Sequence, residues 1–163
     1  MFKVSFKETP KNPSKLVTKM GNETTVMLRG TCDLPAFWKY IPEEIVKWIE
    51  GQAHVESYED IVNNQLIIYA KGISKCHPED KYDTVFGERM AESRAKECIY
   101  KFFCGLCYRL EEYYQKILFG GYGVVDTTNQ GVVGAYIKYE KLWQHEKHHQ
   151  VELLQNKVHG GEQ

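Results

Sequence analysis

The residues with the clearest capacity for chemistry are a glutamate and its neighbouring histidines in the C-terminal part of the chain. The run from His145 to His149 reads HEKHH and matches the pattern H-E-x-x-H. In zinc peptidases, two histidines one helical turn apart bind the metal, and the glutamate activates a water molecule. Here the motif is surrounded by polar side chains, and Gln155 stands where a third ligand is sought. We therefore interpret this segment as a solvated helix face and expect no bound metal.

Two cysteine patterns could also carry chemistry. Cys104 and Cys107 match C-x-x-C, but redox motifs of this type begin a helix, where the helix dipole lowers a thiol pKa. This pair lies in the middle of an expected helix around Gly105, so we expect buried small residues that permit close helix packing. Cys76 and His77 are adjacent in sequence, and adjacent side chains rarely point at a common atom. We predict no catalytic residue and no cofactor.

The hydrophobic pattern and the turn residues indicate the elements that position these side chains. Proline, glycine and asparagine mark the breaks, β-branched alternation marks the strands, and apolar residues spaced by three or four mark the helices. The expected elements are a strand from Lys3 to Glu8, a turn at Gly21-Asn22, a strand from Thr24 to Thr31, a helix from Pro35 to Gly51 with a break at Pro42, strands from His54 to Val62 and Gln65 to Ser74 joined by Asn63-Asn64, a main helix from Thr84 to Phe119 capped by Asp83, and a last helix from about Asn129 to Lys157.

The main helix is unusually apolar around its middle. Between Cys98 and Tyr108 only Lys101 is charged, and a helix that is apolar on nearly all sides must be covered on nearly all sides. We expect the last helix to fold back over it as a helical hairpin, or a second copy of the chain to cover it as a homodimer. The predicted fold class is α+β, an antiparallel sheet packed by a long helix, with a core domain at 1–119 and a helical extension at 120–163.

Composition and charge narrow the function classes. The chain has 163 residues, a net charge of -1 and 13% aromatic residues, including 11 tyrosines. The near-neutral net charge argues against a strongly basic nucleic-acid-binding protein. Tyrosine and tryptophan are common at protein interfaces. The start of the chain lacks the apolar run of a secretory signal, no stretch could span a membrane, and five cysteines favour reduced thiols in a cytoplasm. The candidate partner-binding residues are Lys3, Lys7, Lys15, Lys19, Arg29, Tyr136, Tyr139 and Trp143.

The segment 65–96 resembles a pattern found in small uncharacterised proteins of phages and prophages of Gram-positive bacteria. It reads GISKCHPED from Gly72 to Asp80 and GERMAESRA from Gly87 to Ala95, similar to G-x-A-x-C-x-P-x-D followed by G-x-x-x-A-x-x-R-A. Related domains are similar in fold to double-stranded-RNA-binding domains. This chain differs in having Ser74 at a small apolar position, a longer helix and an added C-terminal helix. The resemblance implies a mobile-element origin and action in a bacterial host cytoplasm.

Three hypotheses of function follow. The first is a non-enzymatic binding protein that inhibits a host protein or ribonucleoprotein defence complex, such as a CRISPR effector nuclease, in the manner of anti-CRISPR proteins. The second is binding of double-stranded nucleic acid through the basic N-terminal region together with Lys71, Lys75 and Lys81. The third is a zinc-dependent hydrolase that uses His145, Glu146 and His149.

Overall fold

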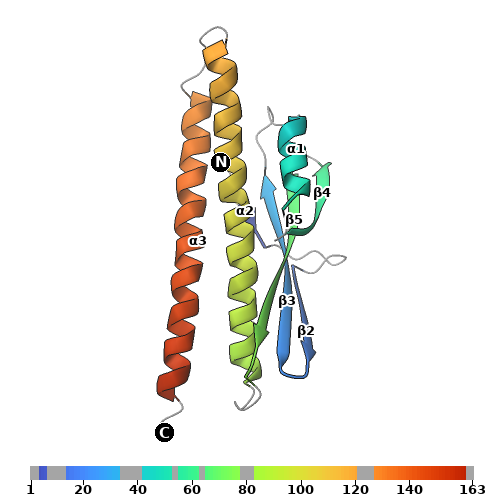
Figure 1. The fold of residues 1–163 in the computed structure, drawn as a ribbon, viewed down its shortest axis with the longest axis vertical. Helices are drawn as coiled ribbons and strands as arrows, with labels where there is room; N and C mark the ends of the chain where they lie inside the picture. The colour runs from blue at the N-terminus through green and yellow to red at the C-terminus, as the bar shows by residue number, and fades with distance from the viewer. Residues whose placement is uncertain are drawn as a thin grey trace.

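The computed structural model describes residues 4–6, 14–33, 42–52, 55–62, 65–77, 83–120 and 127–160. These residues form an α+β fold in which a long helix packs on an antiparallel sheet and a C-terminal helix packs on the long helix, as predicted (Figure 1). The elements in chain order are β1 (Val4–Ser5), β2 (Lys15–Met20), β3 (Glu23–Asp33), α1 (Glu43–Glu50), β4 (Val55–Val62), β5 (Gln65–Lys75), α2 (Thr84–Gly120) and α3 (Thr127–Gly160).

Most of the expected elements are confirmed with small shifts of their ends. The strand β2, between the prolines and the turn, was not predicted as a separate element. The turn after it was predicted, and Gly21 has a φ of 57°, a left-handed conformation that glycine adopts at little cost. The structure begins α1 at Glu43, directly after Pro42. The expected Asn63-Asn64 turn and the start of the Pro35 helix lie outside the described residues.

The sheet is antiparallel throughout its described part, with the strand order β1-β3-β5-β4. The strand β5 pairs with β3 over the full length of both, so β1 and β2 share the other side of β3 at its two ends. Alternate residues of β3 and β5 point toward α2 and are buried. These are Val26, Leu28, Leu66, Ile68 and Ala70.

The backbone of α2 approaches that of β5 very closely at Gly72. A Cβ atom on Gly72 would lie 2.0 Å from the carbonyl oxygen of Ala91 and 2.6 Å from the amide nitrogen of Ala95. The guanidinium of Arg94 donates a hydrogen bond to the carbonyl oxygen of Ile73 beside this contact. Four residues of the pattern described for segment 65–96 therefore hold α2 against β5. They are Gly72, Ala91, Arg94 and Ala95.

The apolar middle of α2 is covered on its second side by α3, as expected. Phe103 of α2 packs against Tyr139 of α3 with ring centroids 5.5 Å apart, and Tyr139 is 0% exposed. The two helices lie side by side along most of their length, with α2 between α3 and the sheet (Figure 1). Within the described residues, no helix combines the length and the apolar character that a membrane span requires.

Candidate functional site

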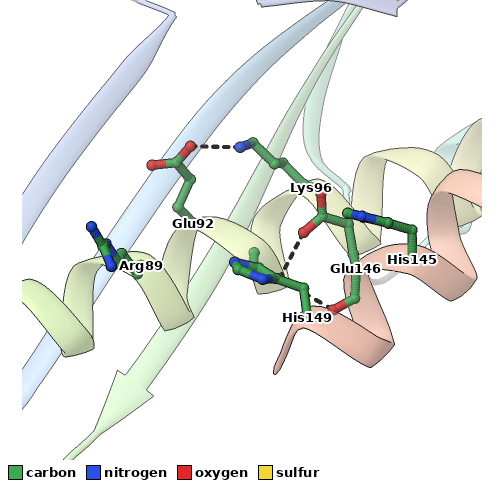
Figure 2. Close-up of a pocket in the computed structure, with 7 residues that line it drawn as sticks. Arg89, Glu92, Lys96, His145, Glu146 and His149 are labelled. Carbon is green, nitrogen blue, oxygen red and sulfur yellow. Dashed lines mark hydrogen bonds and ion pairs between the residues drawn. The ribbon is translucent and has the colours of Figure 1, made fainter. Parts of the chain in front are cut away.

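The H-E-x-x-H segment lines a polar hollow of about 430 Å³ between α2 and α3 (Figure 2). Glu146 is only 9% exposed, and its carboxylate accepts a hydrogen bond of 2.7 Å from the buried hydroxyl of Ser93 on α2. His145 is exposed and His149 is half-buried, with their ring centroids 6.5 Å apart. The interpretation as a solvated face is thus wrong for Glu146, because α2 covers it.

This hollow does not have the geometry of a metal centre. Among the residues that the structure describes, no three His, Cys, Asp or Glu side chains converge on a common point. Glu92, the other carboxylate of the hollow, is bound to Lys15 and Lys96 at 2.7 Å each. Both carboxylates of the hollow thus already have partners, Lys15 and Lys96 for Glu92 and Ser93 for Glu146.

The C-x-x-C pair lies in the packed interior of the protein. Cys104 and Cys107 are buried thiols, and burial raises the pKa of Cys104, so this thiol stays protonated at neutral pH. Gly105 between them packs against Trp48 of α1, whose indole would lie 3.0 Å from an added Cβ. This contact confirms the predicted packing role.

The Asp83 carboxylate accepts hydrogen bonds from the backbone N–H groups of Val85 and Phe86, which confirms the predicted helix cap.

The basic residues of the N-terminal region are divided between two faces of the sheet. Lys15 and Lys19 on β2 face α2, where Lys15 binds Glu88 at 2.8 Å and Glu92 at 2.7 Å, and Lys19 binds Glu88 at 3.5 Å. These two lysines therefore join strand to helix. Lys3, Lys7 and Lys81 lie outside the described residues.

Arg29, Lys71 and Lys75 belong to the sheet face that points away from α2. Directly opposed residues of antiparallel strands share a face, and Arg29 opposes Tyr69 while Met27 opposes Lys71. Lys75 is bound to Glu23 at 3.0 Å. The Nε atom of Arg29 is buried and has no hydrogen-bond partner within the described part of the chain.

The predicted aromatic residues of α3 have different positions. Tyr139 is fully buried under α2, so it holds the helical hairpin together and offers no surface to a partner. Tyr136 and Trp143 instead line a hollow of about 280 Å³ between α1, α2 and α3. Tyr136 is in ring contact with Tyr108, which is 51% exposed. The other residues of this hollow are Trp48, Gln52, Lys101, Phe102, Cys104, Gly105 and Arg109.

A second hollow, of about 470 Å³, continues the first along α2 toward β5. The two share Lys101, and the indole N–H of Trp143 donates a hydrogen bond of 3.2 Å to Glu97 in the second hollow. We call the joined hollows the α2 groove. The members of the second hollow are Lys71, Gly72, Ile73, Arg94, Glu97, Cys98, Lys101 and Gln150.

Sequence reasoning found part of this groove. Tyr136 and Trp143, two of the predicted partner-binding residues, line its aromatic half. Lys71, predicted to bind nucleic acid, borders the second hollow at β5, although its strand position belongs to the outer sheet face. The α2 residues of the groove were missed, although a signal existed. Positions 94, 98, 101, 105 and 108 follow one another by three or four residues and so share one helix face.

Comparison of the chain with protein-family models, with curated proteins and with solved structures found no match. The function must therefore be argued from the groove itself.

Proposed function

We propose that this chain is a non-enzymatic binding protein whose partner docks in the α2 groove. The observation that carries the proposal is the concentration of two tryptophans, two tyrosines and an arginine around one hollow, namely Trp48, Tyr108, Tyr136, Trp143 and Arg109. Tryptophan, tyrosine and arginine dominate the binding energy of protein interfaces when they surround a pocket.

The partner that we propose is a host protein or a ribonucleoprotein complex, and binding would block its action. The resemblance of segment 65–96 to phage and prophage proteins supports a defence complex as the target, in an anti-CRISPR-like role within the bacterial cytoplasm. The described residues support binding rather than catalysis, because the polar hollow around Glu146 lacks three converging metal ligands and the C-x-x-C thiols are buried.

The test is affinity capture from a bacterial host lysate with wild-type protein and with a Tyr108→Ala/Tyr136→Ala double variant. Both side chains reach the groove, so a partner held there should be lost from the double variant. Ile137→Ala is the matched control, because Ile137 is 44% exposed and is not among the groove residues. Equal capture by the wild type and the double variant would contradict the proposal.

Binding of double-stranded nucleic acid is the second candidate, because Arg29 and Lys71 share the outer sheet face. It is supported less well, since Lys15, Lys19 and Lys75 are each bound to glutamates. Phosphate contacts make affinity fall steeply with salt. A gel-shift titration with duplex RNA and DNA at low salt should detect this binding, and its loss in Arg29→Glu would identify the surface.

A further inference from the structure

We infer that two copies of this chain pair through the edge strand β2 and form an antiparallel homodimer. The strand β2 pairs with β3 on one side, and no strand in the described part of the chain pairs with its other side (Figure 1). This surface is separate from the α2 groove, so the inference does not depend on the proposed function. It is also separate from the apolar middle of α2, which α3 covers.

The backbone groups that point to the free edge belong to alternate residues of β2. In an antiparallel pair, residues that exchange hydrogen bonds alternate with residues whose N–H and C=O groups point away from the neighbouring strand. The N–H of Arg29 donates a hydrogen bond of 2.9 Å to the carbonyl oxygen of Ser14, directly before β2. By this alternation, Lys15, Val17 and Lys19 direct their N–H and C=O groups to the free edge. An added antiparallel strand supplies hydrogen-bond partners for them.

The outer face of β2 carries no charged side chain. Leu16 is 57% exposed and Met20 is 78% exposed, the highest value for a large apolar side chain among the described residues. Thr18 lies between them and is also exposed. Edge strands are commonly protected from pairing by charged side chains, particularly lysine. Both lysines of β2 point to the other face, where glutamates of α2 bind them, so this protection is missing from the outer face.

The pattern along β2 complements itself when a twofold axis passes between two copies at Thr18. Leu16 then opposes Met20 of the second copy, and Thr18 opposes Thr18. These are non-hydrogen-bonded positions, where opposed side chains are closest, so both apolar side chains leave water. A pair of threonines across two strands adds a side-chain hydrogen bond. Val17 and Lys19 exchange backbone hydrogen bonds with Lys19 and Val17 of the second copy.

Other registers of the same pairing are less favourable. An axis at Val17 would place Lys15 opposite Lys19, and an axis at Lys19 would place this lysine opposite itself. Like charges that are directly opposite destabilise a pair of strands. An axis at Leu16 would leave Met20 beyond the end of the opposing β2. The second copy in the Thr18 register is therefore the occupant that the edge fits best.

The experiment measures the oligomeric state of the full-length chain by sedimentation equilibrium over a wide range of concentrations. We expect a monomer–dimer equilibrium, because an edge of 6 residues is small beside the interfaces of permanent dimers. Lys19→Pro removes an N–H that points to the free edge, a position where a strand tolerates proline. It should weaken dimerisation about tenfold or more. Lys19→Ala, the matched control, removes the same side chain but keeps the N–H and should dimerise like the wild type.

Substitutions of Thr18 test the register, because this exposed residue opposes its own copy. Thr18→Glu and Thr18→Lys should each dimerise about tenfold more weakly or worse, since each places like charges directly opposite. An equimolar mixture of the two variants should form a heterodimer at least as stable as the wild-type dimer, because the opposed charges now attract. Circular dichroism of every variant checks that the fold is intact.

Three outcomes would overturn the inference. The first is a monomer at every concentration. The second is a dimer that is equally stable in Lys19→Pro and in both Thr18 variants, because it must then use another surface. The third is association into ever larger species, since a twofold contact through β2 uses this edge of each copy once and closes. If Lys19→Pro does not fold, the Thr18 variants and their mixture decide alone.

Discussion

Gly72 and Ser93 show how single residues determine the contacts of α2. Gly72 permits backbone contact between β5 and α2, because any Cβ atom there would meet backbone atoms of Ala91 and Ala95. Ser93 donates its hydroxyl to the buried carboxylate of Glu146 and so joins α2 to α3. One position requires the absence of a side chain, and the other requires a particular donor.

Gly72→Ala should destabilise the protein by about 3 kcal/mol, at the upper end of the usual overpacking range, because backbone atoms cannot rotate away from the added methyl group. Gly134→Ala is the matched control on α3, since no atom lies within 4 Å of its added Cβ. It should stabilise the protein by about 0.5–1 kcal/mol through helix propensity. Urea unfolding measures both. A neutral Gly72→Ala would contradict the close approach of strand and helix.

Ser93→Ala should lower the free energy of unfolding by about 1–3 kcal/mol, because it leaves a buried carboxylate oxygen without its donor. Replacing both partners by apolar groups removes the unsatisfied acceptor, so the same serine change should cost much less in a Glu146→Leu background. Denaturant unfolding of the two single variants and the double variant completes the cycle. Equal costs in both backgrounds would show that the hydrogen bond does not couple the two residues.

At the scale of elements, β2 is attached to α2 by charge. Lys15 contacts Glu88 and Glu92, and Glu92 also binds Lys96. The hydrogen bond from Lys15 lowers the pKa of Glu88. Burial alone would raise the pKa of Glu92, but the bonds from Lys15 and Lys96 outweigh it and the pKa is lowered. For Lys15, burial opposes the two glutamate contacts, and the contacts prevail, so its pKa is raised.

These shifts predict the pH dependence of stability. A carboxyl group with a lowered folded-state pKa stabilises the fold above its ordinary pKa of 4.5, and this contribution is lost as pH falls through the lowered value. The folded-state pKa of Lys15 is raised, so its contribution to stability is fully present below the ordinary pKa of 10.5. This contribution is lost as pH rises through the raised value. The thermal unfolding midpoint should therefore decrease as the pH is lowered below 4.5. This decrease should be less steep in Lys15→Met. Lys47→Met, which removes an exposed pair with Glu43, should retain the wild-type profile.

At the scale of the whole molecule, α2 belongs to two interfaces at once. A continuous apolar cluster joins Val26 and Ile68 of the sheet, Leu106 of α2, and Ala135 and Tyr139 of α3. The division into a core at 1–119 and an extension at 120–163 describes the chain order, but the described residues share this cluster. The α2 groove exists only because α1, α2, α3 and β5 meet along one helix.

We therefore expect a single cooperative unfolding transition. Thermal curves followed by far-ultraviolet circular dichroism and by tryptophan fluorescence should coincide, because α2 cannot lose α3 without exposing Phe103, which packs against Tyr139. Tyr139→Ala should lower both curves together, at a cost of about 3–5 kcal/mol. Two separate transitions would show that the helical extension and the core unfold independently.

The sequence by itself determined the fold class, the long central helix and its cover by the last helix. Helix periodicity, turn residues and the lack of charge between Cys98 and Tyr108 are properties of short stretches of chain, and burial follows from them directly. Only the tertiary structure decided which side of each element is free. Three features join positions that are distant in sequence. They are the ion pair of Lys15 with Glu88, the hydrogen bond of Ser93 to Glu146, and the placement of Trp48, Tyr108 and Trp143 around one hollow. Local patterns cannot specify such contacts, because they depend on the crossing of α2 with the sheet and with α3.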